Sequence, residues 1–178
     1  FFGPIDLPAD RWQVPDGLTT DPQAETSRYE AAIRAAGGIG LQLLGVGRNG
    51  HIGFNEPGSA FDSLTRCVDL TEDTRQANAV DFPPGVTVAR RALTMGIGTI
   101  LDSREALLVV TGEHKAEILA RSLEGPVVGV ITATALQFHR RCHVITDEAA
   151  ASQLELKEFY RDEVSHLPVW RDYLDQIL

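Results

Sequence analysis

The sequence predicts an α/β fold of the Rossmann-like type, with an open, mostly parallel sheet and helices on both faces. Segments typical of strands alternate with segments typical of helices along the 178 residues. Two short apolar runs, Ile39–Val46 and Ala106–Thr111, are typical of buried strands. A glycine-rich loop follows the first run, and open α/β sheets place ligands at such loops. The length suits a single domain over residues 1–178.

The first half of the chain begins with a connection and continues into a well-marked helix. Residues 1–17 contain three prolines and little periodicity. Thr20 or Asp21 is the expected N-cap, Pro22 lies in the first turn, and the helix ends at Gly37. The strand over 39–46 follows, and the other elements expected here are a short strand over 65–70 and a helix over 71–79.

The second half alternates more regularly. Its expected elements are an apolar piece over 92–96, a helical turn over 99–102, a strand over 106–111, a helix over 113–124, a weaker strand over 127–132, a helical turn over 133–138 and a strand over 143–146. From Asp147 the chain is predicted to be helical. Apolar residues recur at helical spacing from Leu167 to Leu178, which predicts a C-terminal helix over 164–178.

Composition excludes several classes of partner. The net charge of −9 argues against a nucleic-acid-binding surface, which is usually basic. No apolar run is long enough to span a membrane, and no signal peptide is recognisable, so a cytoplasmic location is expected. Cys67 and Cys142 lie in apolar segments and are expected to be free thiols in a reducing compartment.

The loop from Gly45 to Ser59 (G-V-G-R-N-G-H-I-G-F-N-E-P-G-S) is the most informative stretch. Its five glycines allow tight turns and close approach of the backbone to a ligand. His51 is suited to proton transfer near neutral pH, and the carboxylate of Glu56 could orient it. The alternative is that His51 only hydrogen-bonds the loop backbone.

Part of this loop, Gly45 to Gly50, also fits the dinucleotide fingerprint G-x-G-x-x-G, with Asp69 near the position of a ribose-binding acid. That fingerprint must open a helix whose N-terminus carries the pyrophosphate. The following residues include Pro57 and Gly58, which form poor helices. We therefore expect no dinucleotide cofactor.

Two other clusters carry weaker signals. His139 and His143 flank a metal-like stretch, but no further Cys or His obviously completes a zinc site, so no metal is expected. Lys115 follows the strand over 106–111 at the start of a helix, where phosphate groups bind. It is equally consistent with an ordinary surface lysine.

Taken together, these motifs resemble the glucosamine-6-phosphate deaminases of the glucosamine/galactosamine-6-phosphate isomerase family. The resemblance rests on the loop from Gly45 to Ser59, on Leu70–Asn78, on Ala92–Leu101 and on Gly112–Ala116. It covers most of the chain from about Gly40 to Leu154 and leaves the N-terminal third of the family fold unmatched.

The resemblance implies a reaction in amino-sugar catabolism: glucosamine 6-phosphate and water give fructose 6-phosphate and ammonia, with no cofactor. His51 would open the sugar ring, assisted by Asn49 and Glu56. Lys115 would bind the phosphate, and Gly47 and Gly50 would contact the substrate. The expected partner is a small sugar phosphate, with no nucleic acid or membrane; whether the protein forms a homo-oligomer is left open.

Three departures from the family pattern matter. The family's preceding segment carries a glycine/threonine phosphate loop and an Asp that serves as the enolisation base; neither is present here, so we predict that the chain alone is inactive. Val80 stands where the family usually has a phosphate-binding Arg. Ser59 and Arg66 match an allosteric site, but Val68 replaces its Lys, which argues against that regulation.

Two other functions remain as alternatives. The first is 6-phosphogluconolactonase activity, because that enzyme shares the fold and a related Gly-His loop; the run Phe54–Pro57 favours the deaminase. The second is a non-catalytic domain that binds a sugar phosphate and regulates another activity.

Overall fold

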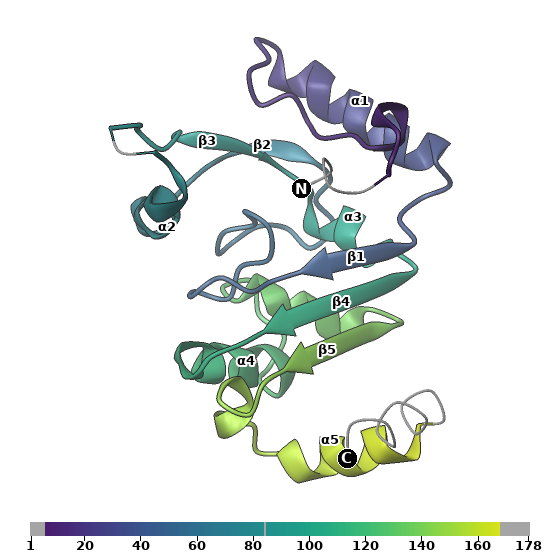
Figure 1. Cartoon of the computed structure of the whole chain (residues 1–178), viewed down its shortest axis with the longest axis vertical. Coiled ribbons are helices and arrows are strands. Elements are labelled where there is room, and N and C mark those ends of the chain that lie inside the picture. Colours follow the sequence, from purple (N-terminus) through teal and green to yellow (C-terminus); the bar gives the residue numbers. More distant parts are fainter. Residues whose placement is uncertain (1–5, 84, 168–178) are drawn as a thin grey trace.

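A three-stranded parallel sheet forms the centre of the molecule (Figure 1). The computed structural model describes residues 6–83 and 85–167. The strand order is β1-β4-β5, and Leu44, Leu108 and Val144 lie side by side across it. The α/β class and the mostly parallel sheet are therefore confirmed. The strands are β1 (Leu41–Leu44), β4 (Glu105–Val110) and β5 (Cys142–Thr146).

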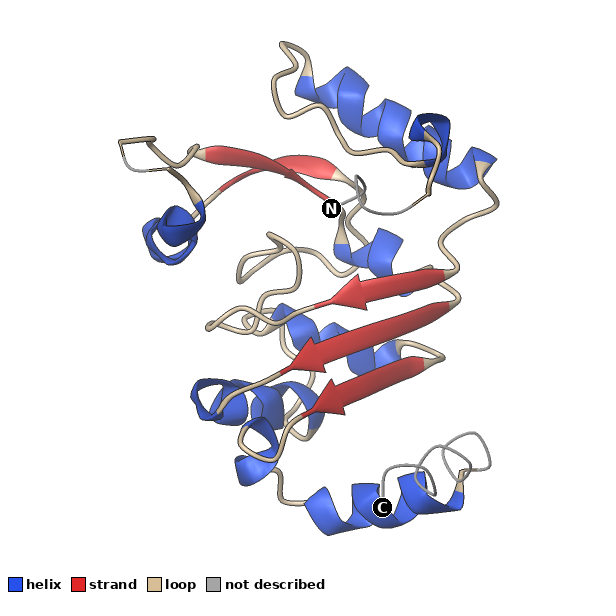
Figure 2. Cartoon of the chain, viewed as in Figure 1, coloured by secondary structure: helices blue, strands red, loops and turns tan. Residues whose placement is uncertain are grey.

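Helical segments cover one face of this sheet, behind the strands in the view of Figure 2. Alternate residues of the strands, such as Leu108 and Val110, pack there against apolar side chains of the helical segments, such as Leu119 and Leu136. This packing forms the hydrophobic core. The covering segments are α3 (Ile97–Leu101), α4 (Ala116–Leu123) and the 3-10 segments η4 (Thr132–Phe138) and η5 (Ala150–Gln153). The 3-10 segment η3 (Glu113–Lys115) leads into α4.

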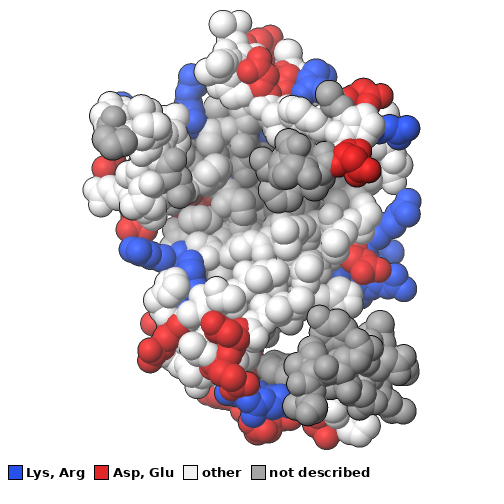
Figure 3. Space-filling view, viewed as in Figure 1, with Lys and Arg blue, Asp and Glu red and all other residues white. Residues whose placement is uncertain are grey.

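The opposite face of the sheet is open in the described part of the chain. Leu43 is 63% exposed there, and Leu41, Val109 and Ile145 are exposed with it. Figure 3 shows mostly uncharged atoms over the middle of this face, with charged side chains around it. Among the described residues, the helical segments that pack on the parallel sheet therefore lie on one of its faces.

A separate antiparallel hairpin projects from the sheet and carries a helix. Strand β2 (Arg66–Asp69) pairs with β3 (Arg91–Thr94) in antiparallel fashion. Between them lie α2 (Glu72–Asn78) and the 3-10 segment η2 (Ala79–Asp81). The strand expected over 65–70 is confirmed, but it belongs to this hairpin and not to the parallel sheet.

Side-chain caps define the beginnings of two helices. Asp21 accepts a hydrogen bond from the backbone N–H of Ala24 and caps α1 (Pro22–Ala35). The hydroxyl of Thr71 accepts from the N–H of Thr74 and caps α2. The helix start predicted at Asp21–Pro22 is confirmed. The remaining helical segments are the 3-10 segment η1 (Ala9–Arg11) and α5 (Lys157–His166).

One expectation about strands is confirmed only in part, and another is wrong. The run Ile39–Val46 forms a strand only over the four residues of β1. Leu44 alone is buried in it, because alternate side chains of the strand face the open side of the sheet. The stretch 127–132 is a turn closed by a single bridge between Val128 and Ile131. The hydroxyl of Thr134 donates to the carbonyl of Ile131 at 2.6 Å and accepts from the N–H of Val128 at 3.0 Å, so it takes the place of a strand partner.

The C-terminal helix predicted over 164–178 lies mostly outside the described residues: α5 ends at His166, and 168–178 are not described. Among the described residues, none of the helices has the length and apolar character needed to cross a membrane.

Candidate active site

A pocket of about 460 Å³ opens at the carboxyl ends of β1 and β4, beside the loop from Gly45 to Ser59. The loop forms no helix, as its glycines and Pro57 predicted. Helix α2 forms one wall and the segment after β4 forms another. The lining residues with polar side chains are Arg48, His51, Asp73, Thr74, Asn78, His114 and Lys115.

Asn49 fixes the ring of His51. The side-chain oxygen Oδ1 of Asn49 lies 2.6 Å from Nδ1 of His51 and also accepts from the backbone N–H of His51 at 3.2 Å. The amide nitrogen of Asn49 donates to Oε2 of Glu56 at 2.9 Å, which sets the orientation of the amide. Since Oδ1 can only accept, Nδ1 of His51 carries the proton, and Nε2 keeps a lone pair.

Glu56 lies behind His51. Its Oε1 accepts hydrogen bonds from the hydroxyls of Thr74 and Thr71, and its Oε2 lies 3.6 Å from Nδ1 of His51. Burial opposes ionisation of Glu56, but the hydrogen bonds from Thr74 and Asn49 and the nearby His51 outweigh it and lower its pKa. Glu56 is therefore ionised at neutral pH.

His51 is held in its neutral form. Burial lowers its pKa below the ordinary value of 6.5, the charge of Glu56 partly offsets this effect, and Lys115 adds to it. A neutral ring with a free lone pair on Nε2 can accept a proton from a bound molecule.

The two glycines predicted to contact substrate have different surroundings. Gly47 lines the pocket, and the ring of His51 lies directly over it, so that a side chain at this position would overlap the ring. Gly50 has a φ of 83° and packs against Ile131 and Ile118 behind the loop. Its N–H donates to the carbonyl of Gly47 at 3.0 Å. Gly50 shapes the loop, and a substrate contact by it stays a prediction.

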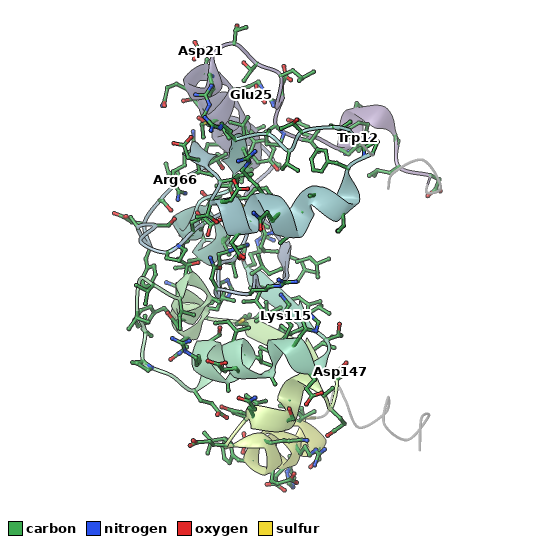
Figure 4. The ribbon with its side chains drawn as sticks, turned by 90° about the vertical axis from the view of Figure 1, so that its left-hand side faces the viewer. Trp12, Asp21, Glu25, Arg66, Lys115 and Asp147 are labelled. Carbon is green, nitrogen blue, oxygen red and sulfur yellow. The ribbon has the colours of Figure 1, made fainter. Side chains whose placement is uncertain are left out.

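Lys115 projects toward the loop from the end of η3 (Figure 4). Its Nζ donates to the carbonyl of Val46 at 2.7 Å. Burial, followed by the charge of Arg48, lowers the pKa of Lys115. Lys115 and Arg48 both line the pocket and bring positive charge to it, so an anionic group of a ligand would bind beside them.

Sequence reasoning assigned no role to three residues of α2 and its cap. Thr71 and Thr74 bind Glu56, and Asp73 lines the pocket and acts to raise the pKa of His51. All three belong to the motif Leu70–Asn78, which resembles the family pattern. The T-x-x-T spacing at a helix start was the available signal.

Other residues singled out from the sequence lie elsewhere. Val80 is 85% exposed and is not among the residues that line the pocket. Arg66, which lies above Lys115 in the view of Figure 4, donates to Oδ1 of the buried Asn55 at 2.8 Å and to the hydroxyl of Ser59 at 2.9 Å. Arg66 and Ser59 therefore support the end of the loop.

The histidine pair does not converge on a metal site. Nε2 of His139 is 3.0 Å from the carbonyl of Ser103, and its Nδ1 accepts from the N–H of Arg141. His143 is exposed on β5 near Glu105. Within the described residues, no three His, Cys, Asp or Glu side chains are grouped to hold a metal ion. Cys67 and Cys142 are free thiols.

Comparisons with known proteins point to one family. The sequence pattern of the family described as glucosamine-6-phosphate isomerases/6-phosphogluconolactonase matches residues 2–144. The chain is 50% identical over 157 residues to a glucosamine-6-phosphate deaminase of Pseudarthrobacter chlorophenolicus, covering 88% of this chain and 61% of that protein. It is 53% identical over 154 residues to one of Rhodopirellula baltica, covering 86% of this chain and 61% of that protein.

Solved structures agree. A monomeric glucosamine-6-phosphate deaminase superposes with a TM-score of 0.82 at 48% identity, covering 86% of this chain and 64% of the other. A 6-phosphogluconolactonase of Trypanosoma brucei shares the fold, with a TM-score of 0.63 at 18% identity, covering 84% of this chain and 63% of the other. The chain thus spans about three-fifths of the length of the relatives it matches. The family pattern, the identities and the superposed fold together place this chain in the glucosamine-6-phosphate isomerase/6-phosphogluconolactonase family.

Proposed function

We propose that the complete protein containing this chain converts glucosamine 6-phosphate and water to fructose 6-phosphate and ammonia, in the cytoplasm and in amino-sugar catabolism. The observation that carries the proposal is the network of Asn49, His51 and Glu56 facing Lys115 across one pocket. Relatives that are identical to this chain at about half of the aligned positions bear the name glucosamine-6-phosphate deaminase. The pocket volume of about 460 Å³ is in the range of small-molecule sites.

His51 is proposed to open the sugar ring. Its Nε2 takes the proton of the hydroxyl on C1; as the carbonyl forms at C1, the bond between C1 and the ring oxygen breaks. The imidazolium then returns the proton to the ring oxygen. The low pKa of His51 supports the first half of this step, because the ring must start neutral.

Asn49 and Glu56 are proposed to assist without exchanging protons. Asn49 holds Nδ1 protonated, so that Nε2 is the basic atom. When His51 becomes cationic, the carboxylate of Glu56 at 3.6 Å stabilises the charge. This arrangement lowers the energy of the intermediate while keeping the resting ring neutral.

Lys115 is proposed to bind the phosphate of the substrate, with Gly47 and Gly50 shaping the loop beside the sugar. The positive charges of Lys115 and Arg48 favour a dianionic group at that end. Asp73, on the α2 wall of the pocket, suits the ammonium group that an amino sugar carries. A substrate with both groups fits this polarity better than a lactone without an amine.

The proposal is tested with protein expressed from the complete reading frame. Ammonia release from glucosamine 6-phosphate is measured beside acid release from 6-phosphogluconolactone, for the wild type and for His51→Gln. We expect ammonia release that falls by about 10²- to 10⁴-fold in His51→Gln. Acid release alone would identify a lactonase. Ligand-induced stabilisation without turnover, unchanged in His51→Gln, would identify a regulatory binding domain.

We also propose that the 178-residue chain by itself does not turn over glucosamine 6-phosphate. The proton transfer from C2 to C1 needs a base, and the resemblance assigns that base to a preceding segment. Turnover by the purified 178-residue chain at the rate of the complete protein would refute this point.

A further inference from the structure

Helix α2 is attached to the rest of the molecule in an unusual way. Of its seven residues, all of them described, only Thr74 is buried. Helices of globular proteins normally pack through an apolar stripe. Here the buried contact is a hydroxyl that donates to the carboxylate of Glu56. The helix lies beyond the edge of the parallel sheet, beside the hairpin β2–β3 (Figure 1), yet its residues Asp73, Thr74 and Asn78 form one wall of the pocket.

The hydroxyl proton of Thr74 can be assigned, and that of Thr71 has two possible acceptors. Each hydroxyl has one proton to donate. Thr74 gives its proton to Oε1 of Glu56, in the shorter of the two contacts. Thr71 lies 3.1 Å from the same oxygen and 3.0 Å from the hydroxyl of Thr74, and it accepts from the N–H of Thr74. Whichever acceptor Thr71 chooses, its proton strengthens the hold on Oε1.

The two oxygens of Glu56 therefore have separate tasks. Oε1 is taken by Thr74 and Thr71 of the α2 start, whereas Oε2 faces the amide of Asn49 and the ring of His51. The side chain of Glu56 is flexible, so Oε2 keeps its direction toward His51 only if Oε1 is held by hydrogen bonds. Those bonds come from Thr74 and Thr71 at the start of α2.

We propose that Thr74, aided by Thr71, is a positioning residue that ties Glu56 to α2 and thereby couples the docking of this pocket wall to the orientation of His51. The consequence for the reaction rests on the proposed function above, whereas the coupling between Thr74 and His51 does not. The groups whose charges face His51 are Glu56 of its own loop, Asp73 of α2 and Lys115 after β4. Of these, Glu56 is the one that Thr74 controls.

The test compares Thr74→Val, which removes the hydroxyl and keeps the shape, with Thr74→Ser, which keeps the hydroxyl. The pKa of His51 is measured by NMR titration of the complete protein, with the resonance identified by its loss in His51→Gln. Burial lowers this pKa and Glu56 raises it, so we expect a further fall in Thr74→Val and a return toward the wild type in Thr74→Ser. With substrate, kcat should fall about tenfold in Thr74→Val, less than the loss of a whole acid/base group, and KM should change little.

A matched control removes the same kind of bond elsewhere. The hydroxyl of buried Thr99 donates to Oε1 of Glu30 at 2.7 Å, remote from the pocket. Thr99→Val should destabilise the protein without changing the His51 titration. If Thr74→Val does not fold, Thr74→Cys, a weaker donor of similar size, takes its place and should titrate below Thr74→Ser.

The inference is overturned if His51 titrates in Thr74→Val as in the wild type, or if Thr99→Val shifts it equally. If the wild type releases no ammonia from glucosamine 6-phosphate, the proposed function fails, while the titration still decides whether Thr74 positions Glu56.

Discussion

Gly47 is predicted to be required for the position of His51 and not for the stability of the fold. A Cβ added at Gly47 would lie 2.6 Å from Nδ1 of His51. Unstrained contacts between such atoms begin near 3.5 Å, so Gly47→Ala should push the ring by roughly 1 Å. The bond from Nδ1 to Asn49, now 2.6 Å long, would then reach about 3.6 Å and cease to be a hydrogen bond.

The expected cost falls on activity. A misplacement of about 1 Å in a catalytic group lowers the rate by roughly 10²-fold. The ring faces the pocket and can swing into it, and the backbone of Gly47 is not left-handed, so the free energy of unfolding should change by less than about 1 kcal/mol. The assay is kcat for ammonia release by the complete protein, with thermal unfolding measured on the same samples.

Gly45→Ala is the matched control. Gly45 belongs to the same loop, its backbone is not left-handed either, and an added Cβ meets nothing within 4 Å. It should leave both kcat and stability near the wild type. The reasoning is refuted if Gly47→Ala keeps the kcat of Gly45→Ala, or if it loses stability in proportion to activity, because the loop would then have misfolded as a whole.

Three further outcomes follow from the same geometry. Gly50→Ala should destabilise the fold by about 2–4 kcal/mol in denaturant unfolding, because Gly50 has a φ of 83° and an added Cβ would lie 2.5 Å from Ile131; a loss under about 0.5 kcal/mol would contradict this. Lys115→Met should raise KM for the sugar phosphate by roughly 10- to 100-fold, because a charge-assisted hydrogen bond is lost. Lys157, which does not line the pocket, provides the control, and Lys157→Met should leave KM unchanged. Equal values of KM in the two variants would show that Lys115 does not bind the phosphate. Burial lowers the pKa of His51 below 6.5, so kcat/KM should fall on the acid side only below pH 6.5. The free energy of unfolding should also decline as pH drops from 6.5 through the pKa of folded His51, because the unfolded chain binds the proton more readily there. An acid limb of kcat/KM above pH 6.5 would be inconsistent with a buried neutral ring.

Local signals predicted the helix starts well and strand pairing poorly. Thr20-Asp21-Pro22 marks the beginning of α1 because a cap depends on residues within one turn of each other. By contrast, the sequence predicted the strand over 65–70 without its partner, and β2 pairs with β3 outside the parallel sheet, because a strand partner far along the chain leaves no mark on the local pattern. The stretch 127–132 has strand-like composition but closes on Thr134 as a turn.

The candidate site was predicted in part. The loop residues Asn49, His51 and Glu56 were singled out from type and spacing, and the structure brings them within hydrogen-bonding or ion-pair distance. Their catalytic roles stay predictions. Thr74 was missed because its importance depends on contact with Glu56, 18 residues away, and a threonine near a helix start is ordinarily explained by capping alone.

The sequence by itself determined the family, the α/β class and the composition of the glycine-rich loop, since these depend on residue types at short and regular spacing. Only the tertiary structure decided that His51 lies over Gly47, that Lys115 reaches Val46 across 69 positions, and that one face of the sheet is open in the described residues. The physical reason is that burial, and the pKa shifts and close approaches that come with it, arise from segments distant in sequence that fold together. Local sequence patterns record which groups are available, and packing sets their distances and charges.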